Sequence, residues 1–192
     1  TGSGTHTITT NAQPRYTTDG SFKLDARPIE IVDDLVIGMA GAVVYTKGAY
    51  SVFAGVASSP AKSIDEDEVI SDIQVRPHIE RAELFNHVRG TYVDPYNKWQ
   101  RTDFPIIGNN TYATEDGEDI YRDIELPFTT DTTRAQRLAK IMLEKSRQGI
   151  TAELTCNYSV MNVAVYDVIS VTNARLGWSS KHFRVMNWQF VP

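Results

Sequence analysis

A change of hydrophobic period between residues 133 and 156 constrains the fold of this chain more than any other feature. Over 133–148 the apolar residues recur with the spacing of one helix face, and over 150–156 they alternate with polar residues as in a half-buried strand. Thr133 and Gln136 have the spacing of a capping box, and Gly149 marks the end of the helix. The predicted buried stripe consists of Ala135, Leu138, Ala139 and Met142, widened by Ile141 and Leu143. We therefore predict a helix followed directly by a strand.

The N-terminal third of the chain predicts a second helix and two hairpins. Residues 28–40 place apolar side chains at i, i+3, i+4 and i+7, and Pro28 suits the first helical turn. Two short apolar runs then flank a glycine-containing turn and predict a hairpin over 42–54. Shorter signals predict another hairpin at 16–22, around Asp19-Gly20, and a strand over 5–10.

These elements and the strand-like segments between them predict an α+β fold. We expect mixed or antiparallel sheets, or a small β-barrel, with two main helices over about 28–40 and 133–148. Further strands are predicted over 84–93, 119–128, 168–171 and 183–190. A break near residue 60 divides the chain into a small α+β module over 1–60 and a β-rich domain over 61–192. In that second domain, residues 94–118 are predicted to form a long irregular loop, which is typical of an interaction arm.

Charge, cysteine content and hydropathy exclude several classes of protein. The net charge of −5 gives no general attraction to nucleic acid, so we expect no nucleic-acid partner. Cys156 is the only cysteine and can form neither an internal disulfide nor a cysteine-rich metal site. The longest apolar run, near 40–45, is far shorter than the ~20 residues that a bilayer requires, so we expect no membrane insertion. Because the chain begins at Thr1 and not at methionine, we expect it to be a fragment of a longer polypeptide.

The sequence carries no recognisable catalytic, cofactor or metal motif. It has no Gly-x-Ser-x-Gly elbow and no phosphate-binding glycine loop, and its histidines are not paired at ligand spacing. We therefore predict no catalytic residue, no cofactor and no metal ion. His87 is interpreted as a structural, hydrogen-bonded histidine, and the acidic run 65–68 as a solvated turn. Asp123 and Glu125 leave a glycosidase pair open, but their alternation along one strand favours a solvated face.

The region 84–130 combines a polar composition with many aromatic residues and prolines, which suits a surface that contacts other chains. Aromatic side chains supply a large contact area at a low cost in conformational entropy. We predict five candidate interface anchors, Tyr92, Tyr96, Trp99, Phe104 and Tyr112. The alternative is that some of them pack on their own domain, and both interpretations stay open for Trp99 and Phe104.

Several runs of this region resemble those of one family of phage proteins. The runs are LFNHVRGTYVDP (84–95), WQRTDFP (99–105), IYRDIELPFTT (120–130) and AQRLA (135–139). They are similar to the tail tip attachment, or host specificity, proteins of long-tailed phages of the lambda type. The resemblance continues at 173–178 and 183–185, includes 28–54, and spans most of the chain from Arg15 to Trp188. One departure is Tyr166-Asp167, where family members often carry Gly-Asp, so this turn must be made without glycine.

The resemblance implies a structural role in a virion. Members of this family are large central tail proteins that form a trimeric hub at the tail tip, and their middle regions are related in fold to the baseplate hubs of contractile tails. This chain resembles the middle, hub-like region. We therefore expect a homotrimer in the full-length protein, contacts with other tail tip proteins, and a host receptor bound by regions outside this fragment. The protein would be made in the bacterial host cytoplasm and located at the tail tip of a phage or prophage particle. The resemblance transfers no catalytic residue.

The alternative from another class is a carbohydrate-binding or cell-wall-hydrolysing module of the tail. It predicts a concave cleft that is lined by aromatic residues and holds two carboxylates about 5 to 10 Å apart. It also predicts that residues 95–118 fold over that cleft, whereas a scaffold protein would point this segment outward.

Overall fold

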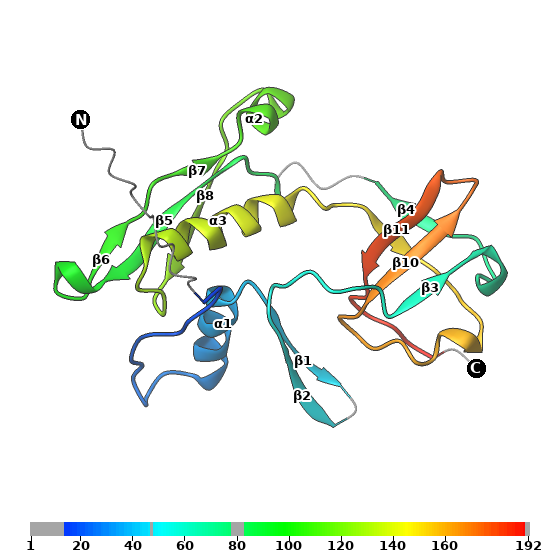
Figure 1. The fold of residues 1–192 in the computed structure, drawn as a ribbon, viewed down its shortest axis with the longest axis horizontal. Coiled ribbons are helices and arrows are strands. Elements are labelled where there is room, and N and C mark those ends of the chain that lie inside the picture. The colour runs from blue at the N-terminus through cyan, green and yellow to red at the C-terminus, as the bar shows by residue number, and fades with distance from the viewer. Residues whose placement is uncertain (1–13, 47, 78–82, 191–192) are drawn as a thin grey trace, which may run out of the picture.

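The structure is a computed structural model of the chain and describes residues 14–46, 48–77 and 83–190. The predicted α+β fold is confirmed, and its sheets are open and do not close into a barrel (Figure 1). Within the described residues the helices are α1 (Pro28–Gly38), α2 (Asn110–Asp116) and α3 (Thr132–Ser146). The strands are β1 (Ala42–Thr46), β2 (Ala49–Phe53), β3 (Lys62–Ile64), β4 (Gln74–Arg76), β5 (His87–Asp94), β6 (Gln100–Asp103), β7 (Ile107–Gly108), β8 (Tyr121–Leu126), β9 (Thr151–Glu153), β10 (Val168–Asn173) and β11 (Trp178–Arg184). The two main helices expected from the sequence are α1 and α3.

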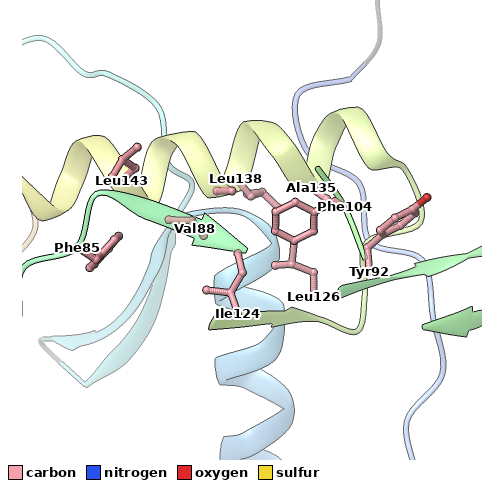
Figure 2. Packing of buried hydrophobic residues seen from close by; sticks show 10 residues of the cluster. Phe85, Val88, Tyr92, Phe104, Ile124, Leu126, Ala135, Leu138 and Leu143 are labelled. Atoms are coloured by element: carbon pink, nitrogen blue, oxygen red, sulfur yellow. The ribbon is translucent and has the colours of Figure 1, made fainter. Parts of the chain in front are cut away.

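The central part of the fold is a mixed sheet that packs against α3. Strand β5 pairs in parallel with β8 on one side, and antiparallel with β6 and β7 on the other. Because side chains alternate along a strand, Val88, Ile124 and Leu126 share the face that packs on α3. Figure 2 shows them beside Leu138 of this helix. Gly90 is required where β5 and β8 meet, because an added Cβ would lie 1.9 Å from the carbonyl oxygen of Ile124.

A second hydrophobic core lies in the C-terminal part of the chain. Strand β10 pairs antiparallel with β11 and in parallel with β3. The buried centre of this core consists of Ile64, Val163, Ile169 and Val171. Strands β4 and β9 form a separate antiparallel pair. The two cores are therefore built on different sheets, with α3 leading from the first toward the second (Figure 1).

The turn that precedes β10 is made without glycine, as the sequence predicts. Tyr166 itself has a φ of 77°, in the left-handed region that residues with a side chain rarely adopt. Its N–H donates to the carbonyl oxygen of Val185 at 2.7 Å. Its ring centroid lies 4.9 Å from that of Phe53 and 4.4 Å from the guanidinium carbon of Arg184. These contacts hold the strained residue and connect the β1–β2 hairpin with the C-terminal sheet.

The N-terminal part of the described chain consists of a loop, α1 and the β1–β2 hairpin. Both the helix and the hairpin are confirmed predictions, with Pro28 in the first turn of α1 and Gly48 at a φ of 80° in the hairpin turn. The hydroxyl of Tyr16 donates to the carbonyl oxygen of Gly55 at 2.6 Å and ties the loop to the end of the hairpin. None of the described residues between 14 and 60 is buried.

Two local predictions are wrong, the hairpin at 16–22 and the capping box of Thr133 and Gln136. A long-range hydrogen bond replaces the first, and a different N-cap residue replaces the second. The segment 16–22 forms no hairpin; instead, the N–H of Asp19 donates to the carbonyl oxygen of Phe128 at 3.1 Å. Helix α3 is not capped by Thr133. Asp131 is its N-cap and accepts a hydrogen bond from the N–H of Arg134 at 2.9 Å.

The segment 94–118 is not the irregular loop that the sequence predicts. It forms β6, β7 and α2, and β5 and β6 are joined by a short turn. Helix α2 begins after Asn109, whose side-chain oxygen accepts from the N–H of Thr111 at 3.0 Å, and ends at Gly117, which has a φ of 81°. The segment therefore has regular structure of its own.

The remaining strand predictions are partly correct. The strand expected over 150–156 is limited to β9, and the strand expected over 183–190 overlaps only the end of β11. The strand expected over 5–10 lies outside the described residues. The division of the chain into domains over 1–60 and 61–192 stays a prediction. In the part of the chain that the structure describes, no helix combines the length and the apolar character needed to cross a bilayer.

Candidate functional site

The turn between β5 and β6 is the part of the predicted interface that the structure exposes. We call residues 95–99 of this turn the tip. The carboxylate of Asp94 accepts a hydrogen bond from the N–H of Tyr96 at 2.9 Å, and the carbonyl oxygen of Asp94 accepts one from the N–H of Trp99 at 2.9 Å. The amide of Asn97 donates to the hydroxyl of Thr102 at 3.3 Å. These bonds, with Pro95 at the start of the turn, fix its conformation.

The tip contains backbone strain. Lys98 and Trp99 have φ values of 55° and 60°, so two successive residues with side chains lie in the left-handed region. Such a conformation costs about 1 kcal/mol or more for each residue that is not glycine. The turn spans five residues, 95–99, and lacks the Asn-Gly or Asp-Gly pair of the common two-residue hairpin turns, which explains why the sequence does not signal a hairpin here.

Two of the five candidate anchors project from the tip into solvent. The side chain of Tyr96 is almost fully exposed, at 98%, and Trp99 is 61% exposed. The hydrogen bonds of the turn hold both residues at the end of the β5–β6 hairpin, which extends beyond the end of α3 (Figure 1). Large aromatic residues held in a fixed position on a protruding turn are typical of the residues that dominate binding at an interface.

The other three candidate anchors contact their own domain. Tyr92 and Phe104 are buried, with exposures of 9% and 3%, and both belong to the core between α3 and the central sheet (Figure 2). Tyr112 is half-buried on α2, and its hydroxyl donates to Glu144 at 2.9 Å. This hydrogen bond raises the pKa of the Tyr112 phenol. Of the two residues for which both interpretations were open, Trp99 is therefore exposed and Phe104 is packed inside.

A buried polar network that the sequence did not reveal supports the start of β5. Asn86 is fully buried; its amide donates to Asp116 at 2.8 Å and to the carbonyl oxygen of Glu118 at 2.7 Å. Its side-chain oxygen accepts from the N–H of Ile120 at 2.8 Å. Arg147 donates to Asp116 at 2.9 Å, which raises the pKa of the guanidinium. The network joins α2, α3 and the start of β5 through residues that are about thirty or more positions apart in the sequence. No local sequence pattern therefore predicts it.

The outward face of the central sheet is covered by ion pairs. Arg89 contacts Asp123 at 2.6 Å, and Arg101 contacts Glu125 at 2.7 Å. The interpretation of Asp123 and Glu125 as a solvated face is confirmed, since both side chains are exposed. The hydrogen bond from Arg89 lowers the pKa of Asp123, whereas a general acid of a glycosidase needs a raised pKa.

Other candidate groups also have structural partners. The ring nitrogen Nδ1 of His87 lies 2.7 Å from the side-chain oxygen of Asn86, which confirms the interpretation of a hydrogen-bonded histidine. In the acidic run, Glu68 accepts from the N–H of Asp65 at 2.8 Å and pairs with Lys62 at 2.9 Å. Among the residues that the structure describes, no group of three or more histidine, cysteine, aspartate or glutamate side chains could hold a metal ion.

A shallow hollow lies beside α2. Its lining consists of Asn110, Ala113, Thr114, Gly117, Glu118 and Asp119. No aromatic residue belongs to this lining, so the hollow offers no ring on which a sugar could stack. The aromatic-lined cleft predicted by the carbohydrate alternative is therefore not formed there.

Comparisons with known proteins agree with a phage origin. Residues 36–188, which make up more than half of the chain, match the model of a family described as "Putative phage tail protein". A chain in the solved structure "Virion of native gene transfer agent (GTA) particle" is similar, with a TM-score of 0.66 and 14% identity over 82% of this chain. This chain spans 35% of that one. A second similar chain is the 43 kDa tail protein of prophage MuSo2 from Shewanella oneidensis, with a TM-score of 0.49, 13% identity, and coverage of 85% and 48%. No curated protein matches the sequence. At such low identities, the first likeness shows a shared fold.

Proposed function

Because the chain belongs to the family of phage tail proteins whose model it matches, we propose that it is a hub-like segment of a central tail-tip protein that assembles with sister copies. Family membership makes the protein a structural component of a phage tail, and it shares its fold with a chain of a virion particle. The finer assignment is a homotrimer in the full-length protein. In it, this segment contacts other tail tip proteins and positions regions outside the fragment that bind the host receptor.

The observation that carries the proposal is the fixed, aromatic tip. The backbone strain at Lys98 and Trp99 lowers the stability of the free chain. Because Tyr96 and Trp99 are exposed, the burial of their rings does not offset this loss. A partner that covers both rings removes their apolar surface from water, and the fixed turn lowers the entropy lost on binding. The combination favours a subunit contact over a free surface.

The experiment that tests assembly is sedimentation equilibrium of the full-length protein. We expect a trimer, and we expect the double substitution Tyr96→Ala with Trp99→Ala to shift it toward monomer. The matched control is Tyr158→Ala, because Tyr158 is 70% exposed but lies outside the tip. A full-length protein that stays monomeric would remove the hub assignment.

The location is tested on assembled particles. Gold-labelled antibodies raised against this chain are expected to mark one end of the tail in electron micrographs. Labelling along the whole tail tube would contradict a tail-tip position but not membership of the tail.

A further inference from the structure

The N-terminal part of the structure, residues 14–60 without position 47, exposes many large apolar side chains that no other described residue buries. No described residue of this part is buried. Its large exposed apolar residues are Phe22, Leu24, Ile29, Ile37, Tyr45, Tyr50, Val52 and Val56, with exposures between 36% and 96%. Soluble proteins rarely leave a large contiguous apolar surface open unless it is a site of interaction.

The β1–β2 hairpin is the centre of this surface. Its strands, AVVYT and AYSVF, contain no charged residue and no proline, which are the usual protections of an exposed strand. The pairing register places Tyr45 opposite Tyr50 and Val43 opposite Val52, so these four share one face. The rings of Tyr45 and Tyr50 lie 4.8 Å apart, and Tyr45, Tyr50 and Val52 are each more than 60% exposed. In the described residues the hairpin is a sheet of two strands, which is marginally stable until further structure covers it.

Helix α1 adds negative charge beside the hairpin. It contains Glu30, Asp33 and Asp34 and no basic residue. Glu30 and Asp33 are exposed. Glu30 pairs with the exposed Arg27 at 3.9 Å, so the negative charge beside the apolar face rests mainly on Asp33 and Asp34.

The tip is complementary to this surface, because it combines exposed aromatic rings with a positive charge. Tyr96 and Trp99 are its exposed aromatic residues, and Lys98, between them, is the one charged residue of the tip. In Figure 1 the β5–β6 hairpin and the β1–β2 hairpin extend from different places on the molecule and in different directions. The tip of one copy can therefore reach the N-terminal surface of another copy, but not its own.

We propose that the tip of one copy docks on the β1–β2 hairpin of a second copy, with Tyr96 and Trp99 against Tyr45 and Tyr50. The amine of Lys98 then lies near the carboxylates of α1. This proposal rests on the proposed assembly with sister copies, and it names the two surfaces that meet in that assembly. The contact joins two different surfaces, and such a contact generates a closed ring, as a trimer requires, when its rotation about the axis is 120°. A symmetric contact between two tips is disfavoured, because it would bring two Lys98 amines together.

Sedimentation velocity of the 192-residue chain tests the contact with two complementary double variants. The tip variant carries Tyr96→Ser and Trp99→Ser, and the surface variant carries Tyr45→Ser and Tyr50→Ser. We expect the wild type to associate with rising concentration and each variant to associate at least about tenfold more weakly, as expected for hot-spot residues. The control Tyr158→Ser is expected to associate like the wild type.

A mixture of the two variants gives the decisive result. It contains one intact tip and one intact surface, so we expect a one-to-one heterodimer and nothing larger. A mixture that stays monomeric would overturn the docking. Association of the wild type that neither variant weakens would overturn it as well, and so would a wild type that stays monomeric at every concentration.

A charge exchange keeps the test valid if the surface variant fails to fold. We expect Lys98→Glu to weaken association, Asp33→Lys to weaken it similarly, and the two together to restore it to within about threefold of the wild type. Additive losses in the double variant would contradict the predicted proximity of Lys98 and α1. The tail assignment is tested separately on particles and with the full-length trimer, so failure of this docking leaves that assignment standing.

Discussion

Replacing Asn86 by alanine tests whether the buried polar network holds the central sheet and α2 together. The side chain of Asn86 is fully buried and makes two hydrogen bonds to neutral backbone groups, the carbonyl oxygen of Glu118 and the N–H of Ile120. A third bond goes to the carboxylate of Asp116, which also pairs with Arg147. A neutral hydrogen bond contributes about 1 kcal/mol and one to a charged group about 2 kcal/mol, so these three amount to about 4 kcal/mol. The hydrogen bond between the Asn86 oxygen and Nδ1 of His87, at 2.7 Å, adds to this sum.

That loss is a large part of the 5–15 kcal/mol that typically stabilises a domain. Urea denaturation followed by circular dichroism is expected to show a free energy of unfolding lower by at least about 4 kcal/mol for Asn86→Ala. The exposed Asn97, whose amide makes a single 3.3 Å bond, is the matched control, and Asn97→Ala is expected to change it by less than about 0.5 kcal/mol. Hydrogen exchange localises the effect, because the N–H of Ile120 loses its acceptor. A loss below about 1 kcal/mol for Asn86→Ala would refute the reasoning.

Three further predictions concern strain, burial and charge. Tyr166→Gly and Tyr166→Ala both remove the ring contacts with Phe53 and Arg184, but only glycine relieves the φ of 77°. Thermal unfolding should therefore show the glycine variant to be more stable than the alanine variant by about 1 kcal/mol. Equal stability of the two variants would mean that the turn is not strained. Burial, assisted by the charge of Glu68, raises the pKa of the Cys156 thiol, so alkylation by iodoacetamide at pH 8 should be at least about tenfold slower than for the urea-unfolded chain; equal rates would show an accessible thiolate. Arg89 lowers the pKa of Asp123 below the ordinary 3.8, so the pair should stabilise the fold above that pH and cease to do so as pH falls through the lowered pKa. The stability difference between wild type and Arg89→Gln should therefore shrink on acidification, and a difference that grew would contradict this sign.

The sequence predicts those elements whose signals are local. Helices α1 and α3 and the β1–β2 hairpin follow from the spacing of apolar residues, from Pro28 and from the glycine turn at Gly48. The β5–β6 hairpin is missed because its turn uses Lys98 and Trp99 in the conformation that glycine normally adopts. The buried position of Phe104 depends on this hairpin, because β6 returns the chain to the core.

The candidate site is predicted only in part for the same reason. The sequence indicates an aromatic, interaction-prone region, and period-two alternation along β5 places Tyr92 on the same face as Val88, which is buried. It does not show which rings project outward, since that depends on how β6 pairs with β5. The Asn86 network depends on contacts between separate elements, and the spacing of residues along the sequence does not indicate such contacts.

The positions of strain distinguish an internal role from an external one. Tyr166 and Trp99 both have a side chain at a positive φ, but the ring of Tyr166 packs on Phe53 and Arg184 within the chain, which offsets its strain locally. The ring of Trp99 is 61% exposed, so most of its surface has no such contact in the chain. Natural sequences depart from local rules mainly where function requires it. Strain that is not offset inside the chain is therefore best explained by a contact made outside it. The strands of the β1–β2 hairpin carry no charged residue and expose Tyr45, Tyr50 and Val52, so they supply a surface of matching chemistry.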